Sequence, residues 1–304
     1  MRRRTFLKNM VAGAAAVAAG SALGGPGAAL AQEAQYPDLV AVRGTELTAM
    51  FDRALEALGG LGKYVKSGQT VVVKPNMGWA CSPETCANTN PALVAHIIKN
   101  SLNLGARRVV VFDNTCDNWA AAYRDSGLEA AAKEAGATVA MAHESGYFEK
   151  VEIPGGQYLS GTELHEAYME ADTIINVPVL KHHGGSRMTA AMKNLMGAIW
   201  SRGPLHRNGV DECLPDLLLY KKPTLNVVEA MRVMISGGPR GRGDSRYLSS
   251  QMLLASEDPV AVDSACASIF SSAGLPVPSY IALAAERGIG KADLNSLNVQ
   301  RLIA

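Results

Sequence analysis

Length, composition and charge are those of an ordinary globular protein. The 304 residues are 48% hydrophobic and 19% charged and include 30 glycines, which excludes a disordered tail, a coiled coil and a collagen. Four of the 29 basic residues and none of the 28 acidic residues lie in residues 1–31, so the remainder holds 25 basic against 28 acidic residues, a net charge of about −3. This balance argues against a nucleic-acid binder.

Residues 1–31 have the layout of an export signal. Residues 3–8 (Arg-Arg-Thr-Phe-Leu-Lys) resemble the twin-arginine pattern, a run of Ala, Gly and Val covers residues 10–23, and residues 29–31 (Ala-Leu-Ala) form a small-x-small cleavage pattern. The run of about 14 residues is shorter than the roughly 20 of a membrane span. A basic membrane anchor is the alternative. We expect residues 32–304 to be a single domain, not membrane-spanning, exported to the periplasm or beyond by the twin-arginine route.

The first half of this domain alternates between helical periodicity and short apolar runs. The expected elements, in chain order, are helix 45–58, strand 71–73, helix 91–104, strand 109–112, helix 120–135, strand 138–142, helix 162–170 and strand 173–177. Strands that are apolar throughout and separated by helices are typical of a parallel sheet buried on both faces. The sequence therefore predicts an α/β three-layer sandwich with a mostly parallel sheet and helices on both faces.

The second half continues the pattern less regularly. Helices are expected over residues 188–200 and 211–220, strands over 224–228 and 247–255, and a further helix after Asp258-Pro259, an N-cap followed by proline at the first helical position. The glycine-rich residues 236–243 lack a phosphate-binding motif and are either a surface loop or a lid.

Polar side chains follow three of the predicted strands. Lys74 and Asn76 follow the first, Asp113 and Asn114 the second, and residues 181–183 (Lys-His-His) extend the third. Ligands of such sheets bind beyond the carboxyl ends of the strands. We therefore expect these side chains to share one cleft, with Lys74, Asn76 and Lys181 among its ligand-binding residues.

The segment 181–194 carries the densest functional signal. Gly184 and Gly185 permit a tight turn, Ser186 can cap a helix that begins near Met188, and the amides of that helix would make an anion cradle. Thr189 and Lys193 are four residues apart and would share a face of the helix. Ser186, Thr189 and the neighbouring Asn194 are accordingly predicted to bind the ligand.

A cluster of lysines needs a negative partner, since each like pair at about 4 Å costs about 1–4 kcal/mol. The partner is either an anionic ligand or an acid of the protein such as Asp113, which would make the cluster a structural ion-pair network. Adjacent histidines on an extended segment face opposite ways, and His183, nearer the glycine turn, is favoured for the site. We predict His183, Asp113 and Lys193 as catalytic residues.

A metal is left open by the sequence. His183 and His206 with either Asp113 or Asp216 are candidate ligands, although no ligand spacing supports them. Of the five cysteines, Cys81 and Cys86 are the expected disulfide because a short loop separates them. Their spacing fits no iron–sulfur or haem motif, so the sequence indicates no built-in cluster.

Four motifs and their order closely resemble one known family. They are Val-Lys-Pro-Asn at 73–76, Ile-Ile-Asn-Val-Pro-Val-Leu-Lys-His-His at 174–183, Thr-Ala-Ala-Met-Lys-Asn-Leu-Met-Gly at 189–197 and Ala-Ser-Glu-Asp-Pro-Val-Ala-Val-Asp at 255–263. The match to this family, domain of unknown function 362 (DUF362), covers most of residues 70–290. The family's polar positions fall here on Lys74, Asn76, Asp113, Lys181, His183, Thr189, Lys193, Asn194, His206, Asp258 and Asp263.

The resemblance implies an α/β fold and an association with iron–sulfur proteins. Many relatives carry a ferredoxin-like segment, whereas this chain has no C-x-x-C-x-x-C run, so a redox role would need a separate iron–sulfur or redox partner protein. Two hypotheses follow. The chain is an exported enzyme acting on or through an anionic small molecule or cofactor, or it is a non-catalytic protein that carries a metal or cofactor for a partner iron–sulfur enzyme.

Overall fold

A large mixed sheet organises residues 36–304, which are the residues that the computed structural model describes; the predicted signal at 1–31 lies outside them. Its ten strands are β1 (Leu39–Arg43), β2 (Thr70–Pro75), β3 (Arg108–Val111), β4 (Thr138–Val139), β7 (Thr173–Val177), β8 (Val179–His183), β9 (Arg187–Thr189), β10 (Leu225–Met234), β11 (Tyr247–Ser256) and β12 (Val299–Ile303). A second sheet pairs β5 (Phe148–Glu152) with β6 (Gly161–His165).

The strands of the large sheet run in the order β12-β1-β11-β10-β7-β2-β3-β4, with β8 paired to β10 and β9 to β8. Six of these nine pairings are parallel, so the predicted mostly parallel sheet is confirmed. The carboxyl ends of β2, β3, β7 and β8 consequently reach the same edge of the sheet.

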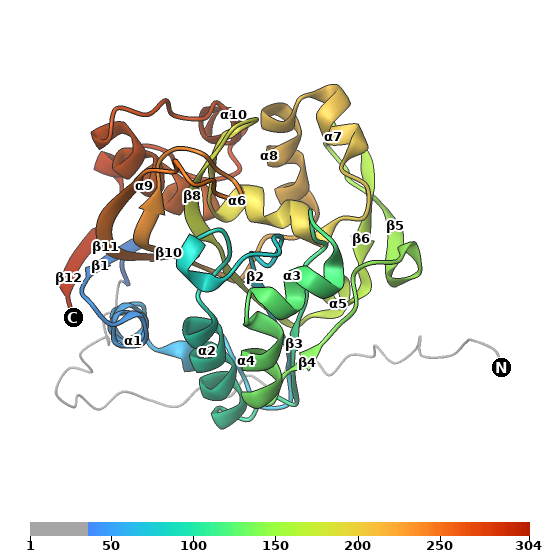
Figure 1. Cartoon of the computed structure of the whole chain (residues 1–304), viewed down its shortest axis with the longest axis horizontal. Coiled ribbons are helices and arrows are strands. Elements are labelled where there is room, and N and C mark those ends of the chain that lie inside the picture. The colour runs from blue at the N-terminus through green and yellow to red at the C-terminus, as the bar shows by residue number, and fades with distance from the viewer. Residues whose placement is uncertain (1–35) are drawn as a thin grey trace, which may run out of the picture. The chain divides into compact units, whose positions relative to one another are not determined.

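Helices cover both faces of the sheet, as predicted (Figure 1). They are α1 (Leu47–Ala57), α2 (Pro91–Asn103), α3 (Trp119–Asp125), α4 (Leu128–Glu134), α5 (Glu166–Glu170), α6 (Ala191–Asn194), α7 (Gly203–Asn208), α8 (Val210–Tyr220), α9 (Pro259–Ser272) and α10 (Tyr280–Glu286).

Alternation along the strands divides the core between the two faces. Val71 and Val73 of β2 pack in one cluster with α1, α2 and α4, whereas Val72 packs in the other with α6, α8 and α9. Successive side chains of a strand point to opposite faces, so an uninterrupted apolar run is buried on both. The expected helix start at Asp258 is also confirmed, because its carboxylate accepts hydrogen bonds from the backbone N–H of Val260 at 2.8 Å and of Ala261 at 3.3 Å.

Three predicted helices are wrong in extent. The helix expected over 188–200 is reduced to α6 and a 3-10 turn at Leu195–Ala198, because residues 187–189 pair with β8 as strand β9. The helix expected over 120–135 is divided into α3 and α4 at Gly127, whose φ of +71° is left-handed and interrupts helical hydrogen bonding. The helix expected over 162–170 is reduced to α5, because residues 161–165 pair with β5 as strand β6. Pairing across a sheet overrides weak helical periodicity here.

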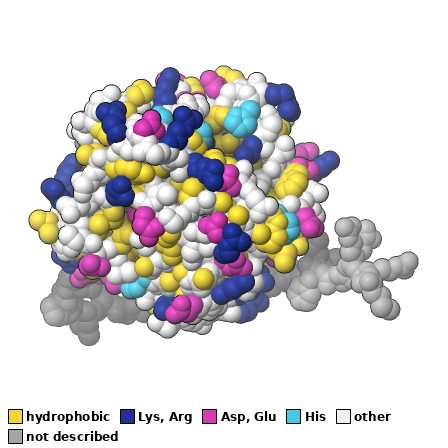
Figure 2. Space-filling model, viewed as in Figure 1, with side chains coloured by type: hydrophobic (Ala, Val, Ile, Leu, Met, Phe, Trp, Pro, Cys, Tyr) yellow, Lys and Arg dark blue, Asp and Glu magenta, His cyan; other side chains and the backbone are white. Residues whose placement is uncertain are grey.

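The surface carries no large field of one sign on the side shown in Figure 2, where Lys and Arg side chains alternate with Asp and Glu. This distribution agrees with the near-neutral composition. None of the helices within residues 36–304 is both long enough and apolar enough to cross a bilayer.

Candidate functional site

A pocket of about 290 Å³ opens at the carboxyl edge of the sheet. It draws side chains from the ends of β2, β3 and β8, from β9 and from the segment around α6. Eight of the residues predicted for the site line it: Asn76, Asp113, Lys181, His183, Thr189, Lys193, Asn194 and His206. The lining also includes Trp79, Cys116 and Arg202.

Beneath this pocket lies a buried ion pair. The Lys74 ammonium donates to Asp113 Oδ1 at 2.8 Å and to the carbonyl of Pro75 at 2.8 Å, while Asp113 Oδ2 accepts the backbone N–H of Met77 at 2.6 Å. The exposures of the two side chains are 0% and 2%. Burial lowers the pKa of Lys74, and the Asp113 carboxylate opposes that shift. Lys74 does not line the pocket, so its predicted ligand contact is wrong and the alternative of a structural ion pair holds for it.

Gly197 closes over this ion pair. A Cβ at this position would lie 1.7 Å from Asp113 Oδ1 and 2.7 Å from Lys74 Nζ, distances that no side chain can adopt. The backbone of Gly197 is also hydrogen-bonded to the loop that follows β3, since the N–H of Asn114 donates to the carbonyl of Gly197 at 2.8 Å. The glycine at the end of the Thr-Ala-Ala-Met-Lys-Asn-Leu-Met-Gly motif therefore allows close packing over the charged pair.

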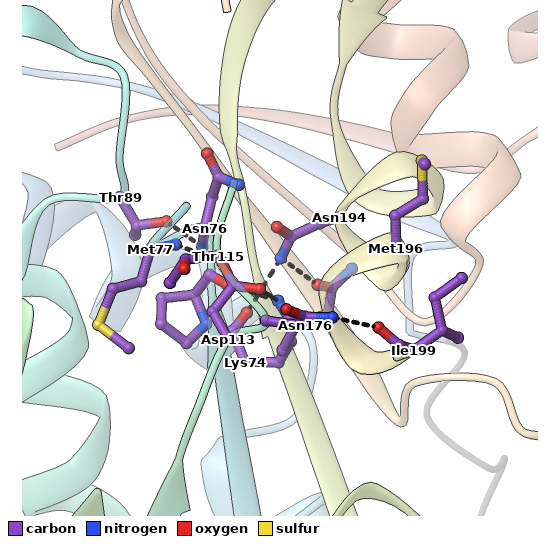
Figure 3. A network of polar contacts seen from close by, with 12 residues as sticks. Lys74, Asn76, Met77, Thr89, Asp113, Thr115, Asn176, Asn194, Met196 and Ile199 are labelled. Atoms are coloured by element: carbon purple, nitrogen blue, oxygen red, sulfur yellow. Dashed lines mark hydrogen bonds and ion pairs between the residues drawn. The ribbon is translucent and has the colours of Figure 1, made fainter. Parts of the chain in front are cut away.

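A chain of buried asparagines sets the orientation of one wall (Figure 3). The Asn176 amide donates to Asn226 Oδ1 at 2.9 Å, and the Asn194 amide donates to Asn176 Oδ1 at 2.8 Å and to the Lys74 carbonyl at 3.1 Å. Asn194 is 3% exposed, and its Oδ1 is a buried acceptor with no partner among the described residues. Because buried polar atoms are normally satisfied, this oxygen is available to a donor on a ligand.

Three cations line the pocket without an acidic partner. Lys181 donates to Asn76 Oδ1 at 2.6 Å and to the Ala87 carbonyl, Lys193 contacts the Met196 sulfur at 3.5 Å, and Arg202 donates to backbone carbonyls. None of the three takes part in the ion pairs formed within residues 36–304. The one lining carboxylate, Asp113, is already neutralised by Lys74.

The lysines consequently hold their protons weakly. Burial lowers the pKa of Lys181 to about 7, with the charge of Lys193 as a further cause. Burial likewise lowers the pKa of Lys193 to about 8, assisted by the charge of Arg202. An anion in the pocket would raise both values, because an opposite charge nearby favours the protonated form.

His183 presents a hydrogen-bond donor rather than a base. Its Nδ1 accepts the backbone N–H of Gly185 at 3.0 Å and of Ser186 at 3.3 Å, so the proton of the neutral ring lies on Nε2. Burial and the charges of Lys193 and Lys181 lower the pKa of His183 to about 3. Of the predicted catalytic residues, His183 therefore offers its Nε2 proton and has no free ring nitrogen that could act as a base. His182 faces away, with its Nδ1 accepting the N–H of Gly238 at 3.2 Å.

The predicted helical anion cradle is wrong. Thr189 ends strand β9 and α6 begins only at Ala191, so Thr189 and Lys193 do not share a helix face, although both line the pocket. The N–H groups of Ala191 and Met192 donate to the Asp263 carboxylate at 2.6 and 3.1 Å. A carboxylate from α9 thus occupies the amides that a ligand would have used.

Ser186 is not a helix cap and does not line the pocket; it is buried, with its hydroxyl 3.5 Å from the Met188 carbonyl. Strand β9, which follows it, pairs back onto β8 and leaves no helix at that position.

The structure gives no support to the candidate metal ligands. His183 and His206 both line the pocket, but no three His, Cys, Asp or Glu side chains within residues 36–304 approach closely enough to hold an ion. Asp216 lies elsewhere, accepting backbone N–H groups of residues 157–159 and pairing with Arg287.

The expected disulfide is also absent. Cys81 and Cys86 both carry free thiols, and their sulfurs face the carbonyls of Arg240 at 3.7 Å and Glu84 at 3.8 Å. Because the two thiols point to different parts of the backbone, they do not meet across the short loop.

Comparison with known proteins identifies the family. A model described as "Domain of unknown function (DUF362)" matches residues 71–268. The chain belongs to the DUF362 family. The matched region contains all eight of the predicted residues that line the pocket. The chain is also 26% identical over 258 residues to a thylakoid-associated protein of Synechocystis sp. The alignment covers 78% of this chain and 74% of the relative.

Two solved structures resemble this DUF362 protein more distantly. One is the lactate racemase apoprotein of Thermoanaerobacterium thermosaccharolyticum, with a TM-score of 0.42, 14% identity and coverage of 69% of this chain and 54% of the other. The second is a protein from Thermotoga maritima, with a TM-score of 0.41, 11% identity and coverage of 74% and 58%. The DUF362 chain thus spans little more than half the length of either.

The sequence did not indicate several lining residues of this DUF362 pocket. Three of them lie in irregular segments without periodic patterns: Trp79, Cys116 and Arg202. The ring centroid of Trp79 is 5.8 Å from Lys181 Nζ. Cys116 lies three residues beyond Asp113, in the loop that follows β3. The available signal was position, since loops at the carboxyl edge of a parallel sheet line its ligand site.

Proposed function

We propose that this DUF362 protein is exported by the twin-arginine route and binds an anionic small molecule in the pocket at the carboxyl edge of its sheet. The observation that carries the binding proposal is the unbalanced charge: Lys181, Lys193 and Arg202 line one cavity whose only carboxylate is paired with Lys74. The export proposal is supported by the pattern of residues 1–31 alone.

The free-energy argument favours a ligand over a structural role. Each like-charged pair at about 4 Å costs about 1–4 kcal/mol at the dielectric of a protein surface or of water. The described part of the chain supplies no acid to Lys181, Lys193 or Arg202, whereas Lys74 has one. A carboxylate or phosphate in the pocket would supply it and would form charge-assisted hydrogen bonds with all three.

Two neutral groups would orient that ligand. His183 offers the Nε2 proton and Asn194 offers an unpaired Oδ1, so the pocket can hold an anion that also carries a hydroxyl or amine. Its volume of about 290 Å³ lies at the lower end of small-molecule sites and fits a metabolite-sized ligand.

The lysine pKa values of the free protein allow proton exchange in an enzyme, and they are equally compatible with a carrier. Amines with a pKa of about 7 in Lys181 and about 8 in Lys193 can take up and release protons near neutral pH, which an ordinary lysine does not do. We assign proton transfer to these lysines and ligand orientation to His183 and Asn194.

The binding proposal is tested with sulfate and inorganic phosphate as probes. Isothermal titration of the wild type should detect both anions, and Lys193→Gln should weaken their affinity at least about tenfold, as expected when a charge is removed from a desolvated contact. Lys133→Gln is the matched control, because that lysine is exposed and pairs with Glu129 outside the pocket. Equal affinity in the wild type and Lys193→Gln would overturn the proposal.

A further inference from the structure

The pocket contains a thiol that no motif indicated. We propose that Cys116 is a nucleophile that captures a carbon electrophile whose carboxylate or phosphate is held by the lysines of the same pocket; this rests on the proposed anion site. The ligand class is thus an anion that carries an electrophilic carbon, and the product is a covalent thioether at Cys116.

Cys116 is held in a defined position beside a cation. Its backbone N–H donates to the carbonyl of Gly78 at 2.9 Å, and its sulfur lies 3.1 Å from Nη1 of Arg202. The guanidinium is itself anchored by the carbonyls of Thr115 and Met196, at 3.3 and 3.2 Å. An adjacent cation stabilises a thiolate, which is the nucleophilic form of cysteine.

The thiol is both accessible and part of the pocket. Cys116 is exposed and lines the same cavity as Lys181 and Lys193. The other four cysteines differ: Cys213 and Cys266 are buried and burial raises the pKa of each, while Cys81 and Cys86 lie outside the pocket lining. Position therefore singles out Cys116 for reaction with a bound molecule.

A second feature of the cavity points independently to a ligand. Asn194 is 3% exposed and lines the pocket, and its Oδ1 has no partner among the described residues. In Figure 3 its amide nitrogen makes the contacts to Asn176 and Lys74, and the oxygen lies on the other side of the amide group. The cavity thus combines an orphaned acceptor, uncompensated cations and a thiol, which are the elements needed to hold an anion and attack it.

The step can be followed with iodoacetate, an anionic carbon electrophile. The Cys116 thiol first releases its proton to solvent, and the thiolate then attacks the methylene carbon. The sulfur–carbon bond forms while the carbon–iodine bond breaks, and iodide leaves with the bonding electron pair. Iodoacetamide undergoes the same displacement without the carboxylate, so comparing the two reagents isolates the contribution of the pocket's charge.

The experiment measures alkylation rates at each cysteine of the full chain by peptide mass spectrometry. We expect Cys116 to show a ratio of iodoacetate to iodoacetamide rates at least about tenfold higher than that of Cys81, the scale on which a charged cleft accelerates encounter with an opposite charge. Sulfate should slow the iodoacetate reaction, Lys193→Gln should remove the preference, and Cys116→Ser should remove the labelled peptide.

The outcomes separate the two proposals. If sulfate binds but Cys116 reacts with iodoacetate no faster, relative to iodoacetamide, than Cys81 does, the nucleophile is refuted and the anion site stands. If sulfate does not bind and Cys116 shows no preference, both fail. If the preference at Cys116 survives in Lys193→Gln, the lysine does not hold the carboxylate and the inference fails as stated.

Discussion

Replacing Asp113 by asparagine tests the buried ion pair beneath the pocket. The substitution preserves shape but removes the charge that faces Lys74, whose side chain is 0% exposed. It also leaves one oxygen where two accept hydrogen bonds, from Lys74 at 2.8 Å and from the Met77 N–H at 2.6 Å. One donor therefore loses its acceptor, and breaking such a buried pair by removing one partner destabilises by about 3–5 kcal/mol.

The part of this destabilisation that comes from the unpaired Lys74 charge has an upper limit, which is the free energy of deprotonating the lysine. Without Asp113, the folded protein can release the Lys74 proton, and neutralising an ordinary lysine at pH 7 costs about 4.6 kcal/mol, since each pH unit below its usual pKa of about 10.4 is worth about 1.36 kcal/mol. The unfolded chain then binds one more proton than the folded chain, so the stability of the variant rises with pH. At pH 9 the deficit should be smaller by about 2–3 kcal/mol.

Urea unfolding followed by circular dichroism at pH 7 and pH 9 measures both effects. Asp125→Asn is the matched control, because its partner Arg124 is exposed and a surface pair of this kind contributes little to stability. A deficit below about 1 kcal/mol for Asp113→Asn at pH 7, or the same deficit at both pH values, would refute the assignment of Lys74 as a buried ammonium that depends on Asp113.

Three further outcomes are expected. Gly197→Ala should destabilise by at least about 1–3 kcal/mol because its Cβ would lie 1.7 Å from Asp113 Oδ1, while Gly184→Ala, whose nearest atom is 3.8 Å away, should melt near the wild type by calorimetry. Sulfate affinity by titration calorimetry should fall from pH 7 to pH 9.5, since the anion keeps its charge while Lys193, with a pKa of about 8, loses its own; constant affinity would contradict this. Burial raises the pKa of Glu229 to about 7, so the ionised side chain destabilises the fold increasingly as pH rises from about 4.3 to 7. In urea unfolding, Glu229→Gln should therefore stabilise by about 1–3 kcal/mol at pH 8 but not at pH 4.5.

The convergence of distant residues could be predicted because it follows from strand direction. Asn76, Asp113 and Lys181 come from three segments of the sequence. Asn76 and Asp113 directly follow the parallel strands β2 and β3, and Lys181 lies in β8, which pairs in parallel with β10. Parallel strands present their carboxyl ends at one edge, so the polar end of each predicted strand marks the same place. The fold class and the lining residues at the ends of the strands required no more than this.

Two features of the site could not be predicted in this way: which side chains at a strand end reach the pocket, and which distant groups bind the backbone amides first. Lys74 and Asn76 are two residues apart, yet only Asn76 lines the pocket, because Lys74 turns inward to Asp113. The amides at the start of α6 bind Asp263, a carboxylate about 70 positions later in the chain. No local pattern near residue 190 shows that this partner exists, and local reasoning therefore leaves those amides free for a ligand.

The lysines at this edge of the sheet differ in whether their charge has a partner when no ligand is bound. Lys74 has Asp113 whether or not a ligand is bound, so its charge is balanced at all times. Lys181 and Lys193 are balanced only when an anion enters. Until then burial lowers the pKa of both, assisted by the charge of Lys193 at Lys181 and by the charge of Arg202 at Lys193. The lysine charges are unfavourable in the free protein and favourable in the complex. Binding an anion should therefore stabilise the folded protein, by about 2.7 kcal/mol when the ligand is at 100 times its Kd. A structural cluster would show no such dependence, because its stabilising partner would already be part of the chain.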